Sequence, residues 1–324
     1  MNEIKWGIIG CGDVTEVKSG PAFNKIANSK LVAVMRRDAA KAEDYAKRHG
    51  VPKWYSNAAD LINDPEVNAI YIATPPLQHE EYTIAALSAG KPVYVEKPMA
   101  LDGAAALRMA EAAKNTGVKL VVAHYRRAQP LFLKIKSLLD EKAIGDVRFV
   151  TLKMLQPAAN NVIANSEENW RINPAISGGG LFHDLAPHQL DLMLYYFGKA
   201  LKFNGIASKN DHTSPVDDLV SGQILFENGI IFSGTWCFSV PKDETADWCE
   251  IIGAKGKISF SVFGQSIKLE VNGSMETINF EPLQHVEQPM IEKVVAYFRN
   301  EDTNPCSAEV ALETMRIMDS FTAS

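Results

Sequence analysis

Short apolar runs alternate with longer stretches of helical periodicity over the first 122 residues. The apolar runs are predicted strands, at residues 6–10, 31–35, 69–73, 92–95 and 119–123. The stretches between them are predicted helices, at residues 39–49, 58–63, 79–89 and 102–116. Strands that alternate with helices pair in parallel within βαβ units. We therefore expect residues 1–122 to form an α/β domain with a parallel sheet.

The pattern changes after residue 123 to consecutive strands joined by tight turns. The predicted strands lie at residues 147–155, 200–208, 219–226, 229–238, 248–252, 257–262, 266–271 and 275–279. The predicted helices lie at 130–141, from 181 or 187 to 197, at 289–300 and at 307–321. Strands joined by turns such as Glu227-Asn228-Gly229 indicate antiparallel pairing. Residues 123–324 are therefore expected to form a second domain of mixed α and β structure.

Composition and charge exclude several classes of protein. The chain of 324 residues has a net charge of −6, which gives no electrostatic reason to bind nucleic acid. Its apolar runs fall far short of the about 20 residues that a membrane helix needs, and its N-terminus shows no signal-peptide pattern. The cysteines Cys11, Cys237, Cys249 and Cys306 lack metal-ligand spacing. We therefore expect a cytoplasmic protein with reduced thiols and no metal site.

The first predicted strand runs into a glycine turn. Gly10 permits the tight turn, and Gly12 lets the backbone approach a pyrophosphate. Thr15 replaces the third glycine of the usual fingerprint, and Gly20-Pro21 should interrupt the first helix. The flanking strand and the βαβ pattern still favour a dinucleotide-binding Rossmann domain. The predicted loop contacts are Gly10, Cys11, Gly12, Asp13 and Val14.

The residues after the second strand bear on the ribose of the cofactor. NAD-binding domains place Asp or Glu there to accept from the 2′-hydroxyl, whereas this chain has Arg36-Arg37. Guanidinium groups suit a 2′-phosphate, and Lys41 could add a third cation. Alternatively, the two arginines are solvated and Asp38 reaches the ribose. The pattern favours NADP over NAD.

Two further strand ends carry candidate residues, because the carboxyl edge of such a sheet faces the cofactor. Thr74-Pro75 follows the third strand, and His79 lies either near the cofactor or at a helix start without contact. Glu96-Lys97-Pro98 follows the fourth strand. The Lys97 ammonium could hydrogen-bond a substrate hydroxyl or carbonyl, or it could belong to an ordinary surface turn. Pro98 stiffens the backbone beside it, and the bond between them could be cis.

An imidazole lies near a predicted helix start in the second half of the chain. Proline is tolerated in a first helical turn, so Pro187 predicts a helix that begins near Ala186 or has Asp184 as its N-cap. His188 would then lie in the first turn, where the helix dipole disfavours imidazolium and leaves a neutral base. The preceding Gly178-Gly179-Gly180 favours a site, because three glycines cost entropy. The alternative is a capping aspartate beside a structural histidine.

Together these segments resemble the Gfo/Idh/MocA family, the glucose–fructose oxidoreductase and inositol dehydrogenase group. The resemblance covers nearly the whole chain. It rests on residues 7–12, Ala73-Thr74-Pro75 with His79, residues 89–98, Trp170-Arg171, Gly178-Gly179-Gly180, Asp184-x-x-x-His188 and Asp191. It implies a Rossmann domain followed by an α/β domain with a large, mostly antiparallel, open sheet. The free face of that sheet often carries subunit contacts in the family, which implies a homodimer or homotetramer.

The resemblance also implies roles for individual residues. Lys97 is implied to be the catalytic lysine, which contacts the nicotinamide ribose and the substrate. His188 is the implied general acid/base, and Asp184 orients the substrate or His188. Substrate or nicotinamide contacts are implied at Tyr125 and Arg126. The implied cofactor contacts beyond the glycine loop are Arg36, Arg37, Lys41, Thr74, Pro75, His79, Glu96, Lys97, Trp170 and Arg171.

The expected activity is hydride transfer between NADP, or NAD, and a sugar, polyol, cyclitol or related hydroxy compound. Neutral His188 or Lys97 would remove the hydroxyl proton, and Lys97 would polarise the developing oxyanion. Two alternatives remain open, because fold analogy does not decide function. One is a non-catalytic dinucleotide-sensing regulatory protein. The other is a glycoside-cleaving enzyme with tightly held, recycled NAD.

Overall fold

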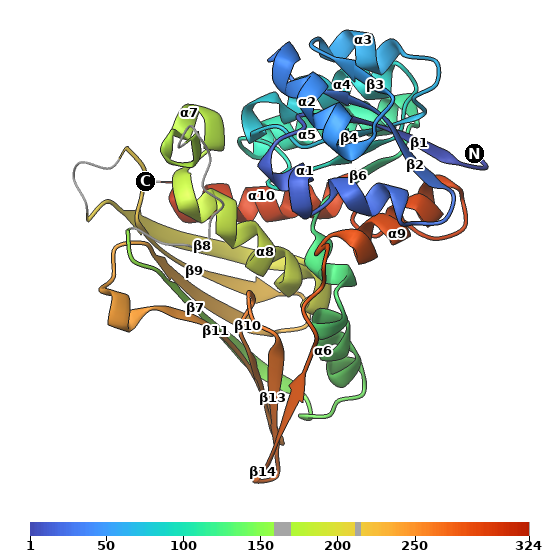
Figure 1. The fold of residues 1–324 in the computed structure, drawn as a ribbon. Coiled ribbons are helices and arrows are strands. Elements are labelled where there is room, and N and C mark those ends of the chain that lie inside the picture. Colours follow the sequence, from blue (N-terminus) through green and yellow to red (C-terminus); the bar gives the residue numbers. More distant parts are fainter. Residues whose placement is uncertain (159–169, 211–214, 324) are drawn as a thin grey trace. The chain divides into compact units, whose positions relative to one another are not determined.

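A computed structural model of the protein describes residues 1–158, 170–210 and 215–323. The chain divides into two compact units, residues 1–128 with 283–315 and residues 129–282 with 316–324. Each unit contains one sheet (Figure 1). Every helix in the described part of the chain is too short or too polar to span a lipid bilayer.

The first unit is built on six parallel strands in the order β3-β2-β1-β4-β5-β6. Their bounds are Ile4–Ile9 (β1), Ser29–Met35 (β2), Lys53–Tyr55 (β3), Ala69–Ile72 (β4), Val93–Val95 (β5) and Leu120–Val122 (β6). The predicted parallel sheet is confirmed. The sequence did not predict β3, because its three residues are partly exposed and form no apolar run.

The helices of the first unit follow their capping residues. They are α1 (Asp13–Val17), α2 (Ala39–His49), α3 (Ala58–Asn63), α4 (His79–Ser88), α5 (Gly103–Thr116) and α9 (Gln288–Phe298), with short 3₁₀ turns η1 (Gly20–Asn24), η2 (Pro76–Gln78) and η3 (Tyr125–Ala128). Asp38, Asn57 and Asp102 each accept a backbone N–H as N-caps. The predicted break before Gly20 is confirmed, because α1 ends at Val17 and η1 begins at Gly20.

Residues 283–315 belong to the first unit, although they follow the second sheet in the sequence. Trp6 of β1 lies against Phe23 and Phe298, at ring-centroid distances of 4.9 and 5.6 Å. The Lys119 ammonium lies 4.4 Å from the centre of the Tyr297 ring. A division at residue 122, as expected from the sequence, assigns this segment to the second domain. The sequence around α9 does not show that this helix belongs to the first unit, because its aromatic partners are distant in sequence.

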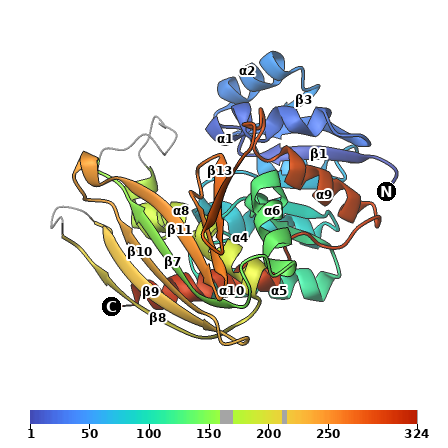
Figure 2. The same cartoon turned by 90° about the horizontal axis from the view of Figure 1, so that it is seen from below.

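The second unit is built on eight strands in the order β14-β13-β12-β11-β7-β10-β9-β8. Their bounds are Val147–Leu155 (β7), Ala200–Ser208 (β8), Leu219–Phe226 (β9), Ile231–Cys237 (β10), Ala246–Gly253 (β11), Gly256–Phe260 (β12), Ser266–Val271 (β13) and Ser274–Asn279 (β14). Neighbouring strands are antiparallel except β7 and β10, which pair in parallel. Figure 2 shows β8, β9, β10, β7 and β11 side by side. The predicted, mostly antiparallel sheet is confirmed.

Helices cover one face of this sheet. They are α6 (Pro130–Asp140), α7 (Pro174–Ser177), α8 (Gly180–Phe197) and the end of α10 (Ala308–Thr322), with 3₁₀ turns η4 (Trp170–Ile172) and η5 (Lys242–Glu244). Phe182 of α8 meets the ring of Trp236 edge-on at 5.2 Å, and Phe321 of α10 lies 6.1 Å from the same ring. Every second side chain of β9 and β10 is buried against these helices, so the sheet has one covered face and one open face.

Candidate active site

Four neighbouring strands of the first unit end at the same level. In the ladder, Ile9 of β1 pairs with Ile72 of β4, Ile72 with Val95 of β5, and Val95 with Val122 of β6. The residues just beyond these strands therefore share one edge of the sheet, since parallel strands place their carboxyl ends together. That edge carries the glycine turn, Thr74-Pro75, Glu96-Lys97 and, after His124, the predicted pair Tyr125-Arg126.

The glycine turn adopts a conformation that only glycine accepts easily. Gly10 has φ of 95°, and a Cβ there would lie 2.8 Å from the backbone nitrogen of Thr74. At Gly12, apart from its chain neighbours, the only atom of the described residues within 4 Å of such a Cβ is the carbonyl oxygen of Gly10, at 3.9 Å. Thr15, at the third fingerprint position, is buried and bonds the carbonyl oxygen of Gly12 through its hydroxyl at 2.8 Å. The turn thus closes on itself and leaves open space before Gly12.

The turn is braced by α2. Tyr45 donates its hydroxyl hydrogen to the carbonyl oxygen of Thr15 at 2.8 Å. On the surface, both nitrogens of the Arg48 fork bond Glu16 at 2.8 Å, and His49 lies 2.8 Å from the same carboxylate. Hydrogen bonding from Arg48 lowers the pKa of Glu16 to about 2. These contacts fix the short helix α1 that follows the turn.

The cations after β2 face the same region. Arg36 is half-buried and donates to the carbonyl oxygen of Cys11 at 3.4 Å, whereas Arg37 is exposed. Asp38 accepts from the backbone N–H of Lys41 at 3.2 Å, so its side chain caps α2. In the structure, Asp38 is therefore the N-cap of α2, and the guanidinium of Arg36 contacts the glycine turn.

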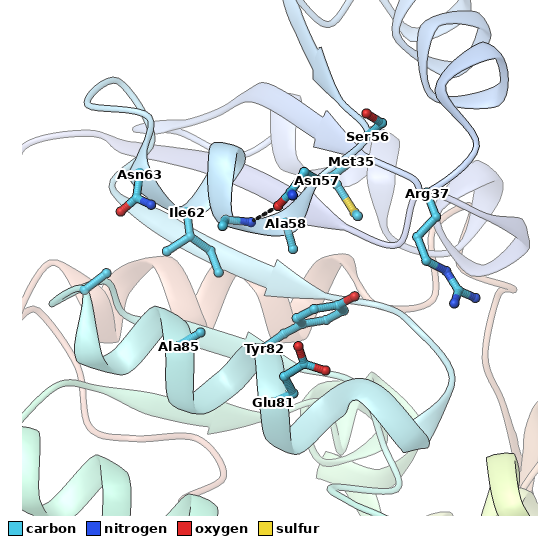
Figure 3. Close-up of a pocket in the computed structure, with 12 residues that line it drawn as sticks. Met35, Arg37, Ser56, Asn57, Ala58, Ile62, Asn63, Glu81, Tyr82 and Ala85 are labelled. Carbon is cyan, nitrogen blue, oxygen red and sulfur yellow. Dashed lines mark hydrogen bonds between the residues drawn. The ribbon is translucent and has the colours of Figure 1, made fainter.

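A cavity of about 440 Å³ lies beside Arg37 between α3 and α4. Its lining includes Met35, Asn57 and Tyr82, so it combines apolar and polar groups. Figure 3 shows Arg37 at one end of the cavity, with the hydroxyl of Tyr82 extending toward that end. No pattern in the sequence singled out Tyr82, because it lies on the exposed side of an ordinary helix.

His79 links two loops at the edge of the sheet. It is fully buried, with Nδ1 2.9 Å from the carbonyl oxygen of Pro98 and Nε2 2.7 Å from that of Thr74. Burial lowers the pKa of His79 to about 4, so the ring is neutral at pH 7 and has one N–H to donate. Both nitrogens face backbone carbonyls, so neither is presented to a bound molecule. The single N–H donates to one of these carbonyls, and the ring lies between the Thr74 and Pro98 loops.

The first two side chains of the Glu96-Lys97-Pro98 segment differ in burial. Lys97 is half-buried, and the bond between it and Pro98 is cis. Glu96 is buried and accepts the hydroxyl hydrogen of Tyr71 at 2.7 Å. Its contacts are therefore with the protein interior. Beyond β6, Tyr125 and Arg126 are buried too, with the guanidinium 5.6 Å from the centre of the tyrosine ring.

The second unit brings together the remaining predicted residues. Arg171 donates to Asp184 at 3.1 Å, and its guanidinium lies 4.5 Å from the centre of the Trp170 ring. His188 lies one helical turn beyond Asp184, on the same face of α8. The His188 ring is buried and meets Phe263 edge-on at 5.8 Å. Trp170, Arg171, Asp184 and His188 thus form one group within this unit.

The predicted helix start at residue 181 is confirmed to within one residue, and the alternative start at Asp184 or Ala186 was wrong. Helix α8 begins at Gly180, so Asp184 is not the N-cap and His188 does not lie in the first turn. Pro187 lies inside the helix, where its missing N–H removes only the bond to the carbonyl of His183. Fifteen residues of α8 are buried, and their packing offsets that loss. The dipole argument for a neutral His188 therefore no longer applies.

The three glycines before α8 are explained by the protein's own side chains. Gly178 caps α7 with φ of 89°. A Cβ on Gly179 would lie 2.1 Å from the His183 ring, and one on Gly180 would lie 2.6 Å from Val216. His183 was not predicted from the sequence; it is buried, and desolvation lowers its pKa to about 4. These glycines make room for His183 and Val216.

Comparison with known proteins agrees with this geometry. Residues 4–124 match a model described as an oxidoreductase family with an NAD-binding Rossmann fold, and residues 132–259 match the C-terminal domain of the same family. An oxidoreductase of Formosa agariphila is 50% identical over 99% of this chain and 98% of its own length. A trans-1,2-dihydrobenzene-1,2-diol dehydrogenase of Mus musculus is 31% identical over 83% of this chain and 78% of its own length.

Solved structures show the same fold. An aldose–aldose oxidoreductase of Caulobacter crescentus, complexed with glycerol, superposes with a TM-score of 0.86 at 23% identity, over 98% of this chain and 96% of that one. A levoglucosan dehydrogenase, complexed with NADH and levoglucosan, gives 0.83 at 23% identity over the same shares. Both family models match in order along most of the chain. The protein is therefore an NAD-binding oxidoreductase that belongs to the Gfo/Idh/MocA family.

Proposed function

We propose that this enzyme transfers hydride between a nicotinamide dinucleotide and the carbinol carbon of a sugar, polyol, cyclitol or related hydroxy compound. The observation that carries the proposal is the common level of the strand ends, which puts Gly10, Thr74 and Lys97 at one edge of the first sheet. Ligands of doubly wound sheets bind at that edge. A lysine there is placed where a reacting oxygen needs a proton donor.

The glycine turn fits the diphosphate of such a dinucleotide. The space before Gly12 is open, and any side chain at this position would fill it. The start of α1 supports an anion there through its N–H groups. The cavity between α3 and α4 offers an aromatic ring and a cation for the adenosine end. When bound, the nicotinamide accepts or supplies the hydride.

The proton would be handled by Lys97 and His188. In oxidation, one of them takes the proton of the substrate hydroxyl, and in reduction the same groups return it. Lys97 also stabilises the developing negative charge on the oxygen. Asp184, which accepts from Arg171, orients the substrate or the imidazole. Tyr125 and Arg126 contact the substrate or the nicotinamide, and Trp170 lines the cofactor.

NADP is the proposed preferred cofactor. Arg36 faces the glycine turn, Arg37 lies at the cavity, and Asp38 caps a helix, so cations rather than a carboxylate meet the ribose. Lys41 adds a third positive charge. One related structure is complexed with NADH and another with NADP. The preference of this enzyme can be tested by comparing the two cofactors. Thermal shifts should be larger with NADP than with NAD, and Arg37→Asp should reverse the order; a larger shift with NAD in the unmodified protein would contradict the preference.

A substrate panel tests the activity itself. It would contain aldoses, polyols, inositols and cyclic diols, since related proteins are named for levoglucosan, aldose and dihydrodiol substrates. Each compound is incubated with NADP or NAD, and reduction is followed by absorbance. We expect turnover of at least one class. A protein that binds the dinucleotide and turns over none of them would contradict the proposal.

The open face of the second sheet is the proposed subunit interface. Leu201 and Ile206 of β8 are 58% and 77% exposed, and the paired residues Phe149 and Ile231 are 45% and 49% exposed. Exposed apolar side chains of this kind mark interaction surfaces. We propose a homodimer or homotetramer, which Ile206→Lys should dissociate in light-scattering measurements. We also place the enzyme in the cytoplasm, since its four cysteines are free thiols.

A further inference from the structure

Two buried carboxyl groups meet behind the strand end that carries Lys97. Glu96 follows β5 and Glu287 precedes α9, and the two residues are 6% and 1% exposed. Both approach Tyr71 of β4, whose hydroxyl oxygen lies 2.7 Å from Oε1 of Glu96 and 3.4 Å from Oε2 of Glu287. All three belong to the first unit. The buried hydroxyl of Ser19 lies 3.0 Å from the Tyr71 hydroxyl oxygen and can donate to it. The cluster therefore contains two acids and one serine hydroxyl around one phenol.

The cluster has too few hydrogens if both acids are ionised. Tyr71 has a single hydroxyl hydrogen, and Glu96 is its nearer acceptor. Within the described residues, Oε1 of Glu287 has no N–H or O–H donor, although it is buried. The Glu287 carboxyl shares the Tyr71 hydroxyl with Glu96 and interacts electrostatically with it. Two carboxyl groups can form a hydrogen bond only when one of them carries a proton.

Burial and the mutual repulsion of the two acids favour one bound proton on the Glu96–Glu287 pair. Burial raises the pKa of both carboxyls, and the charge of Glu96 raises that of Glu287 further. The positive charges of Lys18 and Lys97 oppose this shift at Glu96, and that of Lys18 opposes it at Glu287, yet the pKa values of both carboxyls stay raised. The phenols of Tyr71 and Tyr94 stay neutral, since burial raises their pKa well above the usual range.

We propose that Glu96 and Glu287 share a single proton and, with Tyr71, form a positioning unit for Lys97. The unit ties three segments together. The backbone N–H of Lys97 donates to Oε2 of Glu96 at 3.3 Å, and the N–H of Glu287 donates to the carbonyl of Lys18 at 3.4 Å. With one proton the pair presents a single negative charge to Lys97. Without it, two buried carboxylates repel each other, and the end of β5 is no longer held against the start of α9.

Infrared spectroscopy tests the shared proton in the unmodified protein. Exposed carboxyl groups, with pKa values of about 4, are ionised at pH 8, so a protonated carboxyl band at that pH reports a buried acid. We expect this band in the unmodified protein, its loss in Glu287→Gln and in Glu96→Gln, and its retention in Glu292→Gln, which alters an exposed acid of α9. Absence of the band, or its persistence in either pair variant, overturns the proposal.

The pH dependence of unfolding gives a second test. Between pH 6 and 8 the unfolded chain has released both protons, while the folded pair keeps one. Stability therefore falls as pH rises, by about tenfold in the unfolding constant per pH unit. The unfolding constant of the unmodified protein, divided by that of Glu287→Gln, should rise about a hundredfold over this range. The Glu292→Gln control should follow the unmodified protein. A ratio that stays constant would contradict the shared proton.

The effect on turnover rests on the proposed role of Lys97. With a substrate from the panel, kcat should fall at alkaline pH as the pair loses its proton. Glu287→Gln should remove this alkaline decrease in kcat without changing KM, and Glu292→Gln should retain the decrease. An alkaline limb that is unchanged in Glu287→Gln overturns the positioning role. If no panel compound is turned over, the proposed function fails, and the infrared and unfolding results decide the pair on their own.

Discussion

Two glycine segments, one in each unit, look alike in sequence and differ in what occupies the space before them. A side chain at Gly12 would project into open space, with only the Gly10 carbonyl oxygen nearby at 3.9 Å. A side chain at Gly179 would strike the ring of His183 at 2.1 Å. The first segment leaves room for a ligand, and the second leaves room for a buried histidine. Closely spaced glycines therefore indicate close approach to the backbone, and only the geometry shows what approaches it.

Filling the open space at Gly12 should give the larger effect. Gly12→Val adds an isopropyl group where the diphosphate is proposed to bind, and its Cβ would lie 3.9 Å from the Gly10 carbonyl oxygen. We expect dinucleotide affinity to fall on the order of a hundredfold, about 2.7 kcal/mol, by isothermal titration. The unfolding midpoint serves as the control and should be unchanged. Undiminished affinity in a folded variant would show that the turn holds no diphosphate.

Filling the closed space at Gly179 should change stability instead. Gly179→Ala forces the His183 ring out of place, and overpacking of this kind costs about 1–3 kcal/mol. Dinucleotide affinity of the folded variant should be unchanged. Combining the substitution with His183→Ala should remove most of the added cost, because the clashing ring is gone. Urea unfolding measures all three proteins, and a cost that persists in the double variant would contradict the assigned contact.

The smallest effect concerns the brace outside the first glycine segment. Arg48 holds the pKa of Glu16 at about 2, against about 4.3 in an unfolded chain. Glu16 therefore adds stability above pH 4.3, and this contribution is lost as pH falls toward 2. Because Glu16 is one-third exposed, we expect less than about 1 kcal/mol at pH 6. The free energy of unfolding of Glu16→Gln should equal that of the unmodified protein near pH 2 and should be lower at pH 6.

A matched control for this brace lies on the same helix. Glu43 pairs with Lys47 at 2.9 Å on the exposed side of α2, where both side chains are more than 40% exposed. Glu43→Gln should therefore change stability less than Glu16→Gln does. An equal effect of the two variants would show that the Glu16 contact is an ordinary surface pair.

Local pattern was sufficient for most of the fold. Helices α2 and α3 and strands β7, β8, β9 and β13 have the predicted bounds. Their ends are marked by caps, such as Asp38 before α2 and Gly50 after it, or by changes in apolar alternation. The sequence could not decide between a start of α8 at 181 and one at 187, because proline is common in a first helical turn and nothing local shows that Pro187 lies inside a buried helix.

Part of the candidate site could be located from the sequence because its residues follow strands, although their roles stay predictions. The glycine turn, Thr74-Pro75 and Lys97 lie at strand ends, which the apolar runs reveal. The contacts of His79 and Glu96 depend on segments that meet only in the fold. Glu287, for example, approaches Tyr71 across 216 residues of sequence. Sequence patterns therefore suggested cofactor contacts for His79 and Glu96, whereas the structure shows both bound to the interior.

The central claim is that Lys97 handles the reacting proton, and Lys97→Met tests it most directly. The variant keeps the length of the side chain and removes the ammonium. With an active substrate from the panel, kcat should fall about a thousandfold, while the dissociation constant for NADP stays within about threefold, less than 1 kcal/mol. A kcat within tenfold of the unmodified enzyme, with NADP still bound, would contradict the account.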